Sequence, residues 1–163
     1  NQNEEIPARR NPSQLQDILY TLSHAKARGK NQLIDRLHEF TESVKNRAQF
    51  IIYSDFLEEP KYIADVIHHM RDRKHEVVLF HIMDRQEIEF IFDRPTRFID
   101  LEGGASLLTE PSIIRDEYLK QMKSHLEEIK KICAETQSSH YEIVTDSPVD
   151  EALKEFSFER TQI

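Results

Sequence analysis

Phe50-Ile51-Ile52-Tyr53, followed at once by Ser54-Asp55, is the stretch that decides the fold. A short apolar run that ends in polar residues is typical of a strand buried on both faces of a parallel sheet. Two further runs, Val77–Ile82 and Tyr141–Val144, have the same character. Helical patterns separate the three runs, and strands joined by helices form a parallel sheet with right-handed crossovers. The sequence therefore predicts an α/β fold with a doubly wound, mainly parallel sheet.

The helical patterns have recognisable starts. Asn11-Pro12-Ser13-Gln14 combines a capping Asn with Pro at the first helical position, and Pro60 and Pro111 begin two further apolar-periodic segments. Ser147-Pro148-Val149-Asp150 has a similar capping pattern before a last helix. The expected helices cover residues 11 to about 29, 33–44, 60 to at least 70, 111 to about 137, and the segment after 147.

Between Glu87 and Leu108 the pattern changes. Ile88, Phe90 and Phe92 occupy alternate positions, and a second apolar stretch, Phe98–Leu101, follows Pro95. Gly103-Gly104 then forms a turn before Ser106–Leu108. Alternation broken by such turn residues predicts a small antiparallel β insert in the otherwise parallel fold.

The length and net charge of the chain argue against several classes of function. The chain has 163 residues, and we expect residues 1–163 to form a single domain. A formal net charge of −8 argues against non-specific binding to nucleic acid and against a polybasic membrane anchor. No stretch has the roughly 18 apolar residues that a membrane span needs. The polar opening, Asn1–Arg10, resembles a linker inside a protein, so a fragment of a longer chain is expected.

Reactive side chains give little support for catalysis. Cys133, the only cysteine, lies on the apolar side of a helical pattern, which favours a buried thiol in a reducing, cytoplasmic compartment. The eight histidines have no ligand spacing, and each is expected at a surface or a junction. With three glycines and no Gly-x-Ser-x-Gly, the chain lacks the usual nucleotide-binding and hydrolase fingerprints.

Polar side chains follow each predicted strand, as Ser54-Asp55, as Asp84 and as Thr145-Asp146. The carboxyl ends of parallel strands meet at one edge of a sheet, where ligands bind, and oxygen atoms are the ligands that Mg²⁺ prefers. The three aspartates could therefore serve a Mg²⁺-dependent hydrolase or nuclease. Helix capping or turn chemistry is the favoured explanation for Asp84 and Asp146, whereas the helix after Asp55 can begin without it.

A resemblance to a known family rests on five segments taken together: Phe50–Leu57, His75–Asp84, Glu87–Phe90, Phe98–Glu102 and Thr145–Pro148. In order and spacing they are similar to the C-terminal half of a bacterial family of unknown function. Its members carry a von Willebrand factor A-like domain and are commonly encoded beside MoxR-type AAA+ ATPases. The resemblance implies a partial von Willebrand factor A-like fold and a protein-interaction role, not an enzyme, with such an ATPase as the expected partner. It extends from about Pro7 to Phe158.

The resemblance also implies positions for a divalent metal site. In von Willebrand factor A domains the ligands come from an Asp-x-Ser-x-Ser motif after the first strand, a threonine on a second loop, and an aspartate after the fourth strand. Asp55 corresponds to that aspartate. Asn31 stands where the threonine is expected, and no Asp-x-Ser-x-Ser occurs in the chain. We therefore expect an incomplete metal site, with Mg²⁺ bound only if residues upstream of Asn1 supply the rest.

In the complete fold of that family, the Phe50–Tyr53 strand is central and pairs with the first strand. Without that neighbour it becomes an apolar sheet edge, which favours association with another chain, and we expect a homodimer through it. The leading hypothesis is an interaction module without a catalytic residue. Its expected binding rim consists of Asn31, Ser54, Asp55, Asp84, Thr145 and Asp146.

Overall fold

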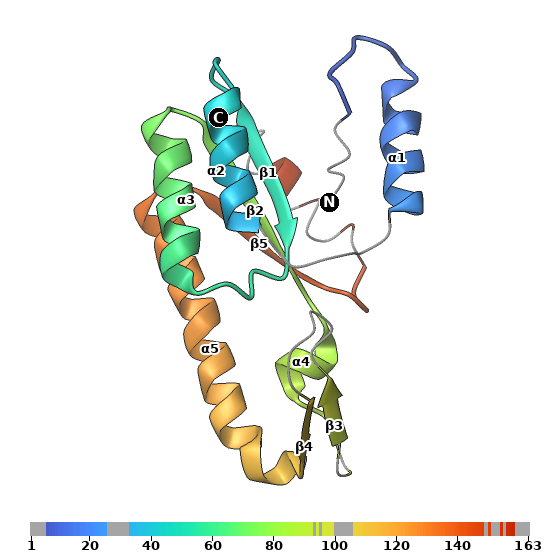
Figure 1. Ribbon diagram of the computed structural model, residues 1–163, viewed down its shortest axis with the longest axis vertical. Coiled ribbons are helices and arrows are strands. Elements are labelled where there is room, and N and C mark those ends of the chain that lie inside the picture. Colours follow the sequence, from blue (N-terminus) through green and yellow to red (C-terminus); the bar gives the residue numbers. More distant parts are fainter. Residues whose placement is uncertain are drawn as a thin grey trace. The chain divides into compact units, whose positions relative to one another are not determined.

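The protein is described from a computed structural model (Figure 1). The structure describes residues 6–25, 33–92, 94, 96–99, 106–148, 150, 154 and 156–158. These residues fall into two compact units, the first with residues 6–25 and the second with all the others. The expectation of a single domain over residues 1–163 remains a prediction.

The first unit contains helix α1, Gln14–His24. The Asn11 side chain accepts a hydrogen bond from the Ser13 N–H at 3.0 Å. The Asn11 carbonyl oxygen accepts a second one from the Gln14 N–H, also at 3.0 Å. The helix nevertheless begins at Gln14, later than predicted, and Ser13 at its N-cap makes no side-chain capping bond. The helix ends at His24, earlier than the expected end near residue 29, because Ala25 leaves the helical conformation (φ −60°, ψ 133°).

A three-stranded sheet, in which all strands are parallel, organises the second unit. β1 (Gln49–Ser54) pairs with β2 (Glu76–Met83), and β2 pairs with β5 (Ser139–Val144). Helix α2 (Leu33–Ser43) precedes β1, α3 (Pro60–Asp72) connects β1 to β2, and α5 (Pro111–Glu135) leads into β5. The predicted α/β fold with a parallel sheet is confirmed (Figure 1).

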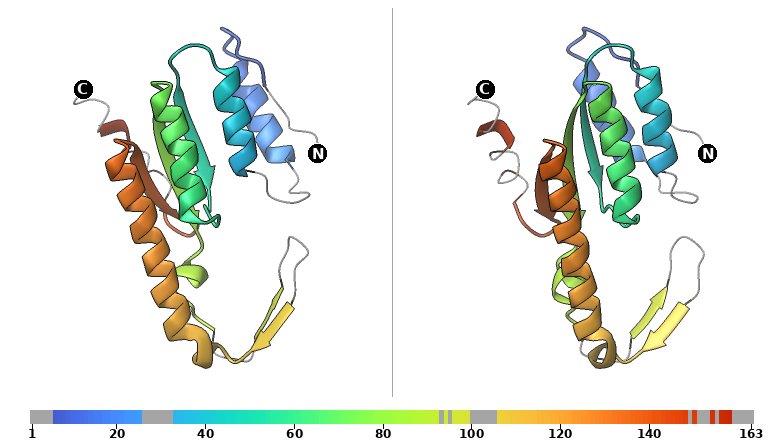
Figure 2. Two further views of the ribbon diagram at one scale, coloured as in Figure 1. Left: turned by 60° about the vertical axis from the view of Figure 1, so that its left-hand side comes forward. Right: turned by 90° about the vertical axis from the view of Figure 1, so that its left-hand side faces the viewer.

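One face of the sheet is buried under helices, which lie beside the strands in both views of Figure 2. Phe50 and Ile52 of β1 and Val77 and Leu79 of β2 share this face. Because strand residues alternate between faces, the helices can cover every second residue of both strands. The helix residues of this core are Ile63, Val66, Ile67 and Met70 of α3 and Ile129, Ile132 and Cys133 of α5.

Cys133 is a core residue that is shielded from solvent. Its side chain is only 2% exposed, as expected for a buried thiol. Burial raises the pKa of the Cys133 thiol to about 12, because the thiolate would lose its hydration. The thiol is therefore protonated and structural at neutral pH.

The opposite face of the sheet is covered unevenly. Ile51 and Tyr53 of β1 are 41% and 55% exposed there. The prediction that Phe50–Tyr53 is buried on both faces is thus wrong for one face, because the described residues leave Ile51 and Tyr53 exposed there. The part of this face formed by β2 and β5 carries a small apolar cluster of Val78, Phe80 and Tyr141, with Ile143 and Phe156 partly buried.

The segment after β2 begins with a helix, so the expected strand at Ile88–Phe92 is wrong. Asp84 and Glu87 form a reciprocal capping box that starts α4 (Arg85–Glu89), and this local hydrogen bonding overrides the apolar alternation. Phe90 ends α4 in a left-handed conformation (φ 48°), with its side chain buried. The rest of the insert is confirmed, because β3 (Thr96–Ile99) and β4 (Ser106–Thr109) pair antiparallel. The expected Gly103-Gly104 turn lies outside the described residues.

The end of the chain is described in part. Lys154 and Phe156–Phe158 are helical, and the Lys154 Nζ atom lies 2.6 Å from Asp150 Oδ2. This agrees with a helix expected after Ser147-Pro148, while residues 149 and 151–153 lie outside the described part. In the portion of the chain that the structure covers, no helix combines the length and apolar character needed to cross a membrane.

Candidate binding rim at the strand ends

The end of β1 forms a tight polar turn. The Ser54 Oγ atom accepts a hydrogen bond from the Phe56 N–H at 3.1 Å, and its hydroxyl donates to Asp55 Oδ1 at 3.3 Å. Phe56 has a positive φ of 47°, which is unusual for a residue with a side chain, yet its ring is 2% exposed and packed in the core. Burial of Phe56 therefore fixes the turn and leaves the Asp55 side chain at the surface.

The end of β2 is joined to the end of β5 by hydrogen bonds. Asp84 Oδ1 accepts from the Gln86 N–H at 2.8 Å, as part of the cap of α4, and Asp84 Oδ2 accepts from the Thr145 hydroxyl at 3.0 Å. Both carboxylate oxygens are therefore engaged. The capping role expected for Asp84 is present, and Thr145 adds a contact between strands that capping alone does not predict.

Arg85 and Asp146 form an ion pair beside this contact. The Arg85 Nε and Nη2 atoms donate to the two carboxylate oxygens of Asp146, the second at 2.9 Å, and Arg85 Nη1 donates to Glu89 at 3.1 Å. The Arg85 guanidinium holds the pKa of Asp146 below its usual range. Two parallel N–H···O bonds fix the geometry as well as the charge. Sequence reasoning missed Arg85, because 61 residues separate it from Asp146.

The structure thus brings together part of the predicted rim. Asp84, Thr145 and Asp146 belong to one network, whereas the sheet register pairs Ser54 with His81, three residues before Asp84. Asn31 lies outside the described residues. Among the residues that are described, no three His, Cys, Asp or Glu side chains form a group that could hold a metal ion. Asp55 is accordingly the one strand-end acid whose carboxylate is bonded within its own turn rather than across strands.

Histidines that are far apart in the sequence donate hydrogen bonds to the backbone of the turn at Ser54-Asp55. The His81 Nε2–H donates to the Asp55 carbonyl oxygen at 2.9 Å, and the His125 Nε2–H donates to the Phe56 carbonyl oxygen at 2.7 Å. His140 Nε2 lies 3.4 Å from His81 Nδ1. The expectation that each histidine lies at a surface or a junction is wrong for His81, which is 1% exposed. Only its position within the apolar run Val77–Ile82 could have indicated this.

The three rings are arranged for the neutral form of His81. Since the Asp55 carbonyl can only accept, His81 carries its proton on Nε2 and offers Nδ1 as an acceptor to His140. Burial, together with the neighbouring His140, lowers the pKa of His81 to about 4. Burial also lowers the pKa of His140. His81 therefore holds the backbone behind Asp55 as an uncharged hydrogen-bond donor at neutral pH.

Comparison with known proteins assigns the family. A model of the family described as "Protein of unknown function DUF58" matches residues 1–128, which is more than half of the chain. The chain belongs to the DUF58 family. The matched region contains Ser54, Asp55 and Asp84 but ends before Thr145 and Asp146. No curated protein and no solved structure matches the chain.

The DUF58 chain also presents a sheet edge next to the rim. In the part of the chain that the structure describes, β1 has a paired strand on one side only, in the order β1-β2-β5. Tyr53 stacks on Phe80 of β2, with ring centroids 4.7 Å apart and planes at 6°, so its exposed ring is held in one orientation. An apolar edge with ordered aromatic side chains is a surface on which another strand can pair.

Proposed function

We propose that this DUF58 chain is a protein-interaction module with a von Willebrand factor A-like fold. The observation that carries the proposal is the position of β1 at the edge of the sheet, with the apolar side chains of Ile51 and Tyr53 exposed. An edge strand offers unpaired backbone groups to an incoming strand, and exposed side chains beside it add apolar contact area. The turn at Ser54-Asp55 adjoins the same strand and supplies a carboxylate at its end.

The role of the strand-end acids favours binding over catalysis. Asp84 and Asp146 hold the ends of β2 and β5 together through Thr145 and Arg85. A general base or a metal ligand needs a carboxylate that can face a substrate, and these two carboxylates face the protein. We therefore propose a binding role rather than a hydrolase, and assign to Asp55 one ligand of a Mg²⁺ site whose other ligands lie outside the described residues.

Two partner classes follow from the proposal. A second copy of the chain can pair through β1, and a MoxR-type AAA+ ATPase is the partner that the family resemblance suggests. A cytoplasmic location fits both partners, and it is supported by the absence of any cysteine that could pair with Cys133 within the chain.

Sedimentation velocity tests the edge. We expect self-association of the wild-type chain and its loss in Tyr53→Lys, because a charge beside the edge opposes strand pairing. Ile113→Lys is the matched control, since Ile113 is also an exposed apolar residue (73%) but lies in α5. A wild-type chain that sediments as a monomer at all concentrations would exclude the homodimer.

Calorimetric titration tests the second partner and the metal. We expect a purified MoxR-type ATPase to bind the wild-type chain and the Ile113→Lys control, and to bind Tyr53→Lys and Asp55→Ala more weakly. Adding Mg²⁺ to the complex tests the metal, because a change in affinity that is present for the wild-type chain and lost in Asp55→Ala would identify Asp55 as a ligand. A chain that neither self-associates nor binds the ATPase would refute the interaction module, and phosphoester hydrolysis lost in Asp84→Ala would support the rival enzyme.

A further inference from the structure

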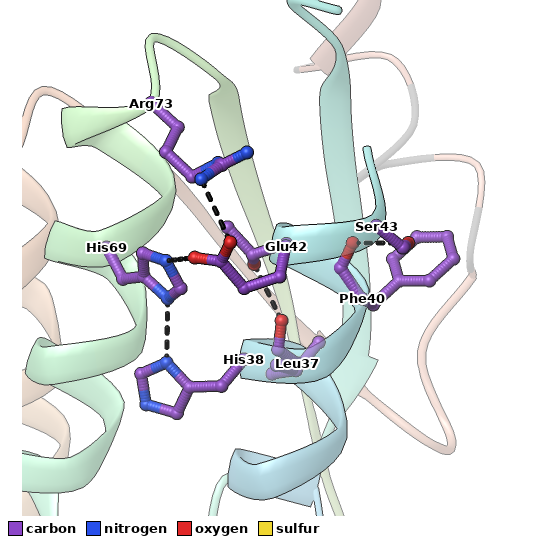
Figure 3. Close-up of polar contacts among 8 residues, drawn as sticks. Leu37, His38, Phe40, Glu42, Ser43, His69 and Arg73 are labelled. Carbon is purple, nitrogen blue, oxygen red and sulfur yellow. Dashed lines mark hydrogen bonds and ion pairs between the residues drawn. The ribbon is translucent and has the colours of Figure 1, made fainter. Parts of the chain in front are cut away.

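A second group of polar side chains lies between α2 and α3 (Figure 3). The Nδ1 atoms of His38 and His69 are 2.8 Å apart. His69 Nε2 lies 2.7 Å from Glu42 Oε1, and Arg73 Nη1 donates to Glu42 Oε2 at 3.1 Å. Helix α2 contributes His38 and Glu42, α3 contributes His69, and Arg73 caps the end of α3. The packing of the two helices therefore assembles the group.

The hydrogen bonds determine which nitrogen atoms carry lone pairs. A carboxylate can only accept, so His69 carries a proton on Nε2 and its neutral ring has the lone pair on Nδ1. This Nδ1 faces His38 Nδ1, and both rings are stacked with centroids 5.1 Å apart. Arg73 in turn fixes the second oxygen of Glu42, which keeps the carboxylate pointed at His69. The His69 side chain is 26% exposed, so the pair is reachable from solvent.

We propose that His38 and His69 chelate a divalent transition-metal ion through their Nδ1 atoms. Metal–imidazole bonds are about 2.0–2.1 Å long, so two ligands at right angles have nitrogen atoms about 2.9 Å apart. The observed 2.8 Å is close to that value. Right-angled nitrogen ligands suit the tetragonal geometry of Cu²⁺ and Ni²⁺, whereas tetrahedral Zn²⁺ needs a wider separation of about 3.3 Å.

The groups around the two histidines are also suited to metal binding. A metal-binding histidine usually donates its other N–H to a carboxylate, and Glu42 occupies that position behind His69. On binding, His38 changes tautomer, so that its proton moves through solvent from Nδ1 to Nε2 and no net proton is released. The protein supplies two ligands and water supplies the others, which suits an exchangeable ion rather than a structural one.

Titration calorimetry with NiCl₂, and electron paramagnetic resonance with CuCl₂, test the proposal on the full chain. We expect one ion per chain, bound by wild type and by the control His68→Ala, since His68 is exposed and adjacent in sequence. His38→Ala and His69→Ala should each weaken binding by at least about tenfold, and Glu42→Gln by about tenfold. The Cu²⁺ spectrum of wild type should show coupling to two nitrogen nuclei.

Circular dichroism establishes that each variant is folded, and His69→Gln replaces His69→Ala if the latter is not. The proposal is overturned if wild type binds neither ion, or if binding survives unchanged without His38 and His69. It is equally overturned if His68→Ala weakens binding as much as His38→Ala does. In each of those cases the 2.8 Å contact is only a hydrogen bond that helps α2 pack on α3.

Discussion

Replacing His81 by glutamine should reduce the amount by which the free energy of unfolding falls as the pH is lowered. His81 lies 1% exposed at the end of β2, where its Nε2–H donates to the Asp55 carbonyl oxygen. A glutamine amide can donate the same hydrogen bond but does not titrate. The variant therefore removes the proton-binding group while it keeps the contact that holds the turn.

The magnitude follows from the pKa of His81, which burial and the neighbouring His140 lower from 6.5 to about 4. Between these two pH values the unfolded chain binds a proton that the folded chain does not, so the free energy of unfolding falls as the pH falls. At roughly 1.4 kcal/mol per pH unit the complete loss is about 3 kcal/mol, of which about 2 kcal/mol is lost by pH 5. The full contribution is present above pH 6.5.

Urea denaturation at a series of pH values from neutral to about 5 measures this loss. Wild type should lose about 2 kcal/mol more than His81→Gln over that range, whatever the difference between the two at neutral pH. His68→Gln, at an exposed position, should follow the wild-type profile. Burial also lowers the pKa of His75 and of His140, so the variant keeps a residual slope. Parallel profiles for wild type and His81→Gln would refute the reasoning.

Three further predictions concern the core and the rim. Cys133, with its pKa raised to about 12, should react with a thiol reagent only in urea; reaction of the folded protein at the rate of a free thiol would contradict its burial. Leu79→Ala should lower the free energy of unfolding, measured by urea denaturation, by about 2–5 kcal/mol, as is typical of a fully buried leucine. Ile51→Ala on the exposed face should lower it by less than about 1 kcal/mol. Asp84→Ala should cost about 1 kcal/mol through the lost cap of α4, and Asp84→Asn, which still caps, should cost clearly less; equal losses would argue against capping.

The parallel sheet could be predicted because the signals that determine it are local. Val77–Ile82 is apolar at every position except His81, and a strand with that composition must be buried on both faces. The Phe50–Tyr53 run has a similar composition, but only Phe50 and Ile52 are buried. Composition determined which segments are strands, whereas the side chains that pack over each face decided how many faces are covered.

The insert shows how two local signals compete. Ile88, Phe90 and Phe92 alternate as in a strand, yet Asp84 and Glu87 stand at the spacing of a capping box. The capping box satisfies backbone N–H groups at once, whereas an isolated strand needs a partner before any of its hydrogen bonds form. Residues 85–89 therefore form a helix, and Phe90 at its end packs on Tyr118 of α5, with ring centroids 4.5 Å apart.

The candidate site was less predictable, because its contacts join distant segments. Asp146 meets Arg85, and His81 meets both Asp55 and His140, across separations of 26 to 61 residues. Nothing in the local sequence of these residues specifies such pairs. The sequence correctly located the acids at the carboxyl ends of the strands, but not which of them the protein itself engages.

That difference separates Asp55 from the other two strand-end acids. Asp84 and Asp146 hold β2 and β5 together, and their carboxylates would have to leave good hydrogen bonds before they could bind anything else. The Asp55 carboxylate accepts a bond from the adjacent Ser54, while its own backbone carbonyl and that of Phe56 are held from behind by His81 and His125. A turn already fixed in this way loses little conformational entropy when it binds. Preorganisation of the backbone, rather than a gathering of acids, therefore supports the proposed role of Asp55 in an interface beside the β1 edge.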